Sequence, residues 1–190
     1  MDVVFFGIQG SGKGTQAKRL AADCGYDIFE AGGELRKIAA SDTDLGRTVK
    51  SYIDAGHLVP HEIIMEVVKA AIGKRPKDQR ILFDGIPRDE NQMRDFDVIL
   101  RDAGRDFRCV HFVLTAEEGT QRILGRAKTE GRADDANLEI IQKRMNIFEE
   151  KTKPVIEEYR KQGKVVDVEA KGSVEDVYEE VRRKILHSKF

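Results

Sequence analysis

The sequence predicts a three-layer α/β protein in which a parallel five-stranded sheet carries helices on both faces. Two observations favour this class. Short apolar runs alternate along the chain with longer segments of helical composition, which is the pattern of repeated strand–helix units. The length of 190 residues suits one domain, spanning 1–190, with small insertions at most.

Five short apolar runs are expected to be the strands. They are rich in β-branched and aromatic residues, and continuous apolar runs of this length are typical of strands that are buried on both faces. The runs are Val3–Phe6, Ile28–Phe29, Ile81–Phe83, Val110–Leu114 and Val165–Val166.

Eight longer segments have the composition and periodicity of helices. Apolar residues recur at helical spacing in the longest of them, and we expect Pro154 to kink it. The segments are 13–22, 34–40, 45–55, 62–72, 91–103, 116–127, 138–162 and 174–186. Between Arg126 and Asp135 the sequence is polar and has no apolar period, so an exposed flap is expected there.

Composition and charge exclude several classes of protein. The chain has 33 basic and 34 acidic residues, so no broad positive surface for nucleic acid is expected. The first apolar run is too short for a membrane helix and lacks the pattern of a signal peptide. We therefore expect no nucleic-acid partner, no membrane association and a cytoplasmic protein.

The first strand is followed by a glycine-rich turn, GIQGSGKGTQ, with the GxxxxGK pattern of a phosphate-binding loop, or P-loop. The turn lies between an expected strand and an expected helix, which is the context that this motif requires. Its glycines let backbone N–H groups turn toward a phosphate, and Lys13 adds a full positive charge. The alternative is a structural turn with a solvated lysine. The motif indicates a nucleotide but does not define a reaction.

The detailed form of this loop, GxxGxGKGTQ, resembles the adenylate kinase family and its close relatives, the UMP/CMP kinases. Six further segments are similar to that family in order and spacing, so the resemblance runs from residue 1 to about 185. They are FEAGGELR (29–36), GHLVP (56–60), FDGIPRDENQ (83–92), QRILGR (121–126), GRADDANLEIIQKR (131–144) and AKGSVEDV (170–177). The resemblance implies phosphoryl transfer from Mg-ATP to AMP, giving two ADP.

The resemblance also implies a division of the site. The residues expected to contact ATP are Gly10, Ser11, Gly12, Lys13, Gly14, Thr15, Arg122, Arg126 and Gly172. Those expected to contact AMP are Ala31, Arg36, His57, Leu58, Val59, Gly85, Ile86, Pro87, Arg88, Gln92, Arg132 and Arg144. The expected catalytic residues are Lys13, Arg88, Arg126, Arg132 and Arg144. Residues of about 30–59 would form a small helical acceptor-binding insert, and residues of about 126–136 a short lid.

Two of these positions also have a chemical argument of their own. Asp84 ends a strand expected beside the P-loop strand, where a carboxylate can hold Mg²⁺ or its waters; the alternative is an ordinary aspartate of a strand-end turn. The amide of Gln92 can both donate to and accept from the edge of adenine, unless it is simply a solvated helix residue. The arginines could instead pair with nearby carboxylates on a solvated surface.

The choice of acceptor base depends on two positions. Ala31 stands where adenylate kinases often have threonine and UMP/CMP kinases have alanine, whereas Gln92 has the amide usual in adenylate kinases. AMP is therefore favoured, and UMP or CMP is the alternative. Only about five residues separate Arg126 from Arg132, so the lid is of the short type, for which the resemblance implies no zinc and a monomer.

Two other classes of function are alternatives to a nucleotide kinase. A GTPase-like switch would need a guanine-reading NKxD segment, and none of Asn91, Asn137 and Asn146 opens one. A binding module that has lost catalysis is the other alternative, and the presence of every expected charged position argues against it.

Overall fold

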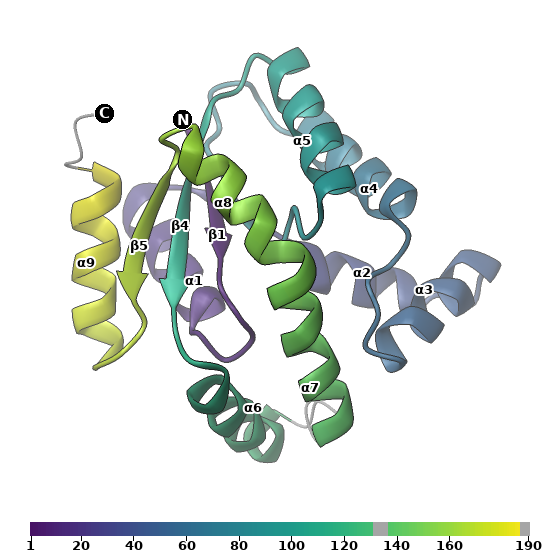
Figure 1. The fold of residues 1–190 in the computed structure, drawn as a ribbon. Coiled ribbons are helices and arrows are strands. Elements are labelled where there is room, and N and C mark those ends of the chain that lie inside the picture. The colour runs from purple at the N-terminus through teal and green to yellow at the C-terminus, as the bar shows by residue number, and fades with distance from the viewer. Residues whose placement is uncertain (131–136, 187–190) are drawn as a thin grey trace.

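The computed structural model describes residues 1–130 and 137–186, with the backbone alone for residues 126–130. Its centre is a five-stranded parallel sheet in the order β2-β3-β1-β4-β5 (Figure 1). The strands are β1 (Asp2–Phe6), β2 (Asp27–Glu30), β3 (Ile81–Asp84), β4 (Phe107–Val113) and β5 (Val165–Glu169). The predicted fold class is confirmed.

Helices connect the strands and cover both faces of the sheet. They are α1 (Lys13–Cys24), α2 (Ala31–Ala39), α3 (Asp44–Asp54), α4 (His61–Gly73), α5 (Glu90–Asp102), α6 (Ala116–Glu130), α7 (Leu138–Ile147), α8 (Lys153–Lys161) and α9 (Val174–Leu186), with a π-helical turn, η2 (Phe148–Thr152), between α7 and α8. The strands point toward α6 and the start of α7, while α2 and α3 extend to one side (Figure 1). None of the helices in the described ranges is long and apolar enough to cross a bilayer.

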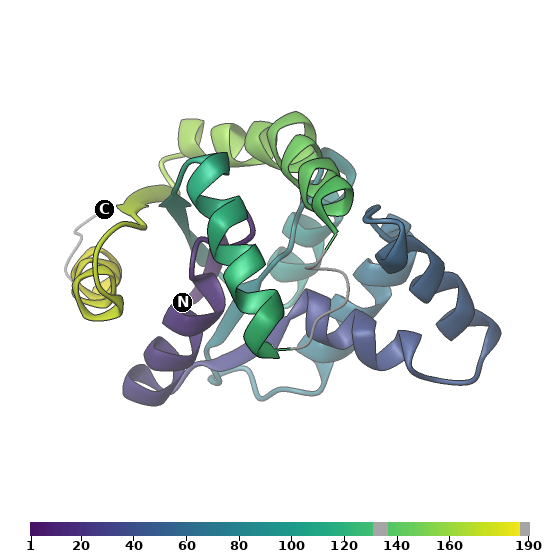
Figure 2. The same cartoon turned by 90° about the horizontal axis from the view of Figure 1, so that it is seen from below.

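The alternation of side chains along β1 divides the core between the two faces. Val4 and Phe6 pack with α4, α5 and α8 on one face. Val3 and Phe5 pack with α1 and α9 on the other. Figure 2 shows α9 and α1 on one side of the sheet. On the other side lies the continuous helix formed by α7, η2 and α8, which we call the α7–α8 rod. The three layers follow from this two-sided burial.

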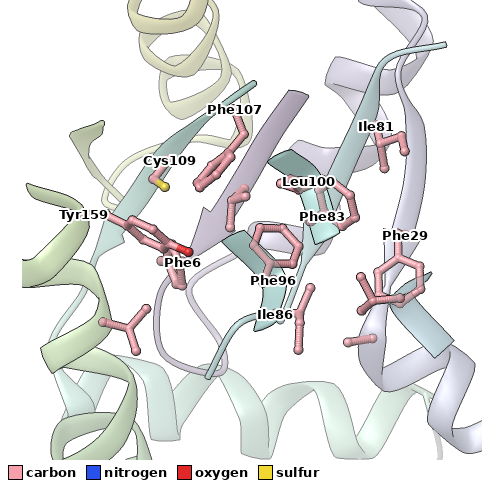
Figure 3. Close-up of a cluster of buried hydrophobic side chains, with 14 of the residues drawn as sticks. Phe6, Phe29, Ile81, Phe83, Ile86, Phe96, Leu100, Phe107, Cys109 and Tyr159 are labelled. Atoms are coloured by element: carbon pink, nitrogen blue, oxygen red, sulfur yellow. The ribbon is translucent and has the colours of Figure 1, made fainter. Parts of the chain in front are cut away.

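Aromatic rings join the helices to the sheet on the first of these faces (Figure 3). Phe96 of α5 contacts Phe83 and Phe107 edge to face, with ring centroids 5.0 and 5.6 Å apart. Tyr159 of α8 meets Phe107 in the same way at 5.3 Å. Such pairs stabilise a fold by roughly 0.5–1.5 kcal/mol each beyond the area they bury. They fix α5 and α8 relative to the sheet.

The long helix expected over 138–162 contains a π turn. The backbone N–H of Lys153 donates to the carbonyl of Phe148, five residues earlier, so the helix widens over η2. Pro154 lies in the first turn of α8. It has no N–H to donate to the backbone carbonyl of Glu150, and a proline ring inside a helix crowds the carbonyl four residues earlier. The proline thus accounts for a local change of helix type at the place where we predicted a kink.

The prediction that an exposed flap begins directly after Arg126 is wrong. Residues 127–130 continue α6 to Glu130, because Ala, Lys, Thr and Glu can all extend a helix and the next glycine is Gly131. The rest of the predicted lid, with Arg132, lies outside the described residues.

A buried ion pair lies at the amino-terminal ends of the strands, away from the glycine-rich turn that follows β1. The guanidinium Nε of Arg105 lies 2.6 Å from Oδ2 of Asp2, and the two side chains are 6% and 3% exposed. The Oδ1 atom of Asp2 also accepts the backbone N–H of Ile81 at 2.8 Å. Asp2 therefore joins β1 to β3 and to the segment that leads into β4.

We expect Asp2→Ala to lower the free energy of unfolding by about 3–5 kcal/mol, because it leaves the buried Arg105 without its counter-charge. Urea denaturation measures this. The matched control is Asp102→Ala, which removes an ion pair with Arg101 whose side chains are 64% and 72% exposed and should change stability by less than about 0.5 kcal/mol. Equal losses in the two variants would contradict the account.

Candidate active site

The P-loop connects β1 to α1 and is packed against α6. Gly10 has a φ of +82°, and a Cβ atom there would lie 2.5 Å from the carbonyl oxygen of Gly119 in α6. Only glycine fits this approach of backbone to backbone. The Nζ of Lys13 donates to the carbonyls of Gly7 at 2.6 Å and Ile8 at 2.9 Å. The lysine is thereby held over the loop.

Two carboxylates stand at neighbouring strand ends beside this loop. Asp84 pairs in register with Phe5 of β1 on one side and with Glu30 of β2 on the other. A Cβ atom added to Gly14 would lie 3.9 Å from Oδ2 of Asp84, so this carboxylate faces the first turn of α1. Burial raises the pKa of the Asp84 carboxyl, and the charge of Lys13 opposes the shift.

Arg88 lies in the segment between β3 and α5, and its side chain folds back toward the start of that segment. Its Nε donates to the carbonyl of Gly85 at 2.7 Å. Gly85 has a φ of +83°, which favours glycine, and a Cβ atom there would displace the guanidinium, since it would lie 2.8 Å from Nη2 of Arg88. Burial lowers the pKa of Arg88; the carboxylate of Asp84 opposes this shift, and the charge of Arg144 adds to it. Arg88 and Arg144 are thus close enough to repel each other.

Gln92 is buried in the first turn of α5, with 3% of its surface exposed. Its Oε1 accepts the backbone N–H of Arg88 at 2.8 Å, and its own N–H donates to the N-cap Asp89 at 2.9 Å. The alternative of a solvated helix residue is therefore wrong. Within the described residues its amide NH₂ donates no hydrogen bond, which leaves that group available to a ligand.

Arg36 of α2 contacts the end of β2, and the segment after α3 contacts α7. Nη2 of Arg36 lies 2.7 Å from Oε1 of Glu30, with side chains 41% and 49% exposed. The exposed His57 has its Nε2 2.8 Å from Nζ of Lys143 in α7. Arg36 thus has a carboxylate partner at the strand end, as the surface-pair alternative required, but it also lines the cavity described next.

One cavity of about 450 Å³ brings most of the predicted site residues together. Among the described residues, six lysines and arginines line it against two acidic residues. The predicted residues among its lining are Gly10, Gly12, Lys13, Gly14, Thr15, Ala31, Arg36, His57, Leu58, Val59, Asp84, Gly85, Ile86, Pro87, Arg88, Gln92, Arg122 and Arg144. A cavity with this charge favours a ligand that carries several negative charges.

Two of the described residues that were predicted for the site do not join this set, and the side chains of two further predicted residues lie outside the described part of the chain. Ser11 is buried, with 2% of its surface exposed, and Gly172 is exposed in the loop before α9; neither lines the cavity. The side chain of Arg126 and the whole of Arg132 lie outside the described residues. Arg122 donates from Nη2 to the carbonyl of Ala170 at 2.9 Å, so it joins α6 to the loop that contains Gly172.

The cavity also contains residues that the sequence did not single out. Lys18, Glu30, Phe148 and Thr152 line it. Glu30 directly precedes Ala31 in the segment FEAGGELR, and its position at the end of a predicted strand could have identified it. Thr152 gave no signal, because its place in the site depends on the π turn.

The residues present suit a magnesium ion that is mostly bound by water and phosphate. Within the described ranges no group of three His, Cys, Asp or Glu side chains converges as a metal site. Asp84 offers a carboxylate beside the P-loop, and Mg²⁺ in phosphate-transfer sites usually takes one or two protein carboxylates and otherwise phosphates and waters. The donor set therefore fits Mg²⁺ bound together with a nucleotide.

The parallel sheet, the P-loop at the end of β1 and the cationic cavity define a P-loop protein that binds phosphorylated nucleotides. Comparison with known proteins narrows this class. The family model "Adenylate kinase" matches residues 5–164. The chain belongs to the adenylate kinase family.

Curated relatives with the same name match over nearly the whole chain. The chain is 34% identical over 182 residues to an adenylate kinase of Bacteroides fragilis, covering 95% of this chain and 96% of the relative. It is 36% identical over 181 residues to one of Thermus thermophilus, covering 95% and 94%. It is 37% identical over 178 residues to one of Maricaulis maris, covering 93% and 94%.

Proposed function

We propose that this chain transfers a phosphoryl group from Mg-ATP to AMP and forms two ADP. The observation that carries the proposal is the gathering of Arg36, Arg88 and Arg144 with Lys13 around one cavity, in a chain whose formal net charge is −1. Family membership and the names of the relatives support the same reaction.

The ATP side consists of the P-loop and the neighbouring strand end. Lys13 and the N–H groups of the loop bind the ATP phosphates, and the N-terminus of α1 adds partial positive charge. Asp84 would hold Mg²⁺ directly or through water. When bound, the ion would supply positive charge that neutralises the phosphates.

The acceptor side consists of the arginines beyond Asp84 and the amide of Gln92. Arg36 and Arg88 bind the phosphate of AMP, and a guanidinium can do so with two parallel hydrogen bonds. Arg144, which lines the same cavity as Lys13 and Arg88, stabilises the transferring group. The NH₂ of Gln92 binds the base.

The chemistry needs alignment and positive charge more than a proton acceptor. Phosphoryl transfer spreads charge over the oxygens of the moving group, so the protein contributes mainly by positioning and electrostatic stabilisation. Arg126 and Arg132 are proposed to join from the lid and to exclude water on closure. The roles of these two residues, the absence of zinc, the monomeric state and the cytoplasmic location stay predictions.

The preference for AMP is tested by an assay of ADP formation with four acceptors. We expect the purified chain with Mg-ATP to use AMP at a higher kcat/KM than UMP, CMP or GMP. Ala31, the residue that is shared with UMP/CMP kinases, is buried and lines the cavity, so the assay is needed to decide between AMP and the pyrimidines. A higher kcat/KM for UMP or CMP would replace the proposal with a pyrimidine kinase, and ATP hydrolysis without transfer would overturn it.

Arg88→Ala should lower kcat/KM for AMP by about 10³ to 10⁵-fold, the scale known for arginines that act on a transferred phosphate. Steady-state kinetics with varied AMP measures this. Arg94→Ala on α5 is the matched control, because Arg94 is 70% exposed and pairs only loosely with Glu90 at 3.4 Å. Near-normal turnover of the Arg88 variant would contradict the proposed mechanism.

Gln92→Leu should reduce the preference for AMP over UMP by roughly 1–3 kcal/mol, since it removes the amide that can pair with adenine. The readout is the ratio of kcat/KM for the two acceptors, because loss of the bond to the Arg88 N–H should slow both reactions alike. Gln162→Leu, an exposed glutamine after α8, controls for the change of residue type. An unchanged ratio would rule out base recognition by Gln92.

A further inference from the structure

Thr152 is a buried hydroxyl group whose position the reaction outlined above does not explain. Its side chain lines the cavity and is 6% exposed. Its Oγ1 donates to the backbone carbonyl of Arg88 at 2.8 Å. The two residues are 64 positions apart in the sequence, so this bond ties the α7–α8 rod to the segment between β3 and α5.

The main chain of Arg88 is held from both sides. Gln92 accepts its N–H at 2.8 Å and Thr152 donates to its C=O at 2.8 Å. The pairing of β3 with its neighbouring strands ends at Asp84, so no strand pairing holds the backbone at Arg88. The position from which its guanidinium reaches into the cavity therefore depends on these two side chains.

The π turn places Thr152 at this point. Thr152 is the last residue of η2, directly before α8, whose Val155, Ile156 and Tyr159 are buried in the core. The hydroxyl is thus attached to a helix that cannot shift without disturbing the core. π turns inside α-helices are frequent at functional sites, and here the turn ends on the residue that contacts Arg88.

We propose that Thr152 is a positioning residue for the acceptor phosphate: through the carbonyl of Arg88, it fixes the guanidinium that binds AMP. The inference rests on the proposed function. Its hydroxyl proton is directed to Arg88, so Thr152 acts through that arginine and not on the nucleotide itself. A small displacement of a group that aligns substrates can cost about 10²-fold in rate.

The test compares Thr152→Val, which keeps the shape and removes the hydroxyl, with Thr152→Ser, which keeps the hydroxyl and removes a methyl. Steady-state kinetics is measured with AMP and with ATP as the varied substrate. We expect the valine variant to lose roughly 10- to 10²-fold in kcat/KM for AMP, with the KM for ATP within about two-fold of the wild type. The serine variant should stay within about three-fold in all parameters.

Two controls separate positioning from general damage. Thr120→Val removes a hydroxyl that donates to the carbonyl of Ala116 at 2.8 Å in α6, and it should leave kcat/KM for AMP unchanged. An unchanged KM for ATP shows that the Thr152 variants are folded. If the valine variant does not fold, Thr152→Ala serves as a second variant without the hydroxyl.

The outcomes distinguish the inference from the proposed function. A wild-type chain that makes no ADP from AMP would overturn the function, and the inference with it. An active wild type with an equally active Thr152→Val variant would overturn the inference alone. So would equal losses in the valine and serine variants, or a loss that affects ATP as much as AMP.

Discussion

The site depends on the alignment of parallel strand ends at one edge of the sheet. Because β1, β2 and β3 run in the same direction and Phe5, Asp84 and Glu30 stand in register, the chain leaves all three strands at the same level. The P-loop, the Asp84 carboxylate and Arg88 are therefore neighbours simply because the strands that precede them end at the same level. Ligands of open α/β sheets bind at this edge for the same reason. The buried helices on both faces maintain the alignment.

The charges gathered at this edge are costly without a polyanion. Burial raises the pKa of Asp84 and lowers that of Arg88, so desolvation disfavours both charged forms. Lys13 is the main charge that supports ionised Asp84, and Asp84 is the main charge that supports ionised Arg88. The remaining cations of the cavity exceed its carboxylates. A nucleotide with its phosphates and Mg²⁺ can balance such an arrangement, which a stable core would not otherwise retain. The electrostatics thus belong to binding and catalysis and not to folding.

Local signals in the sequence predicted the parts of this arrangement that are themselves local. The apolar run before GIQGSGKGTQ predicts β1 and the P-loop because strand, turn and helix follow one another directly. Strand-end Asp84 could be placed because parallel strands end together. The start of α2 at Ala31, despite two glycines, was missed because tertiary packing overrides weak propensities. The extension of α6 to Glu130 was missed although its residues are compatible with a helix, because the polar composition was interpreted as a flap. The contact of Thr152 with Arg88 could not be predicted, since it needs both the π turn and the packing of α8.

The central claim about this protein is that one cavity aligns ATP and AMP for direct transfer. Double labelling tests this most directly, with ATP labelled at the γ-phosphorus and AMP labelled in its base. Direct transfer predicts that both labels appear together in the same ADP molecules, in equal amounts. Phosphorus label released as inorganic phosphate, with the base label still in AMP, would contradict it.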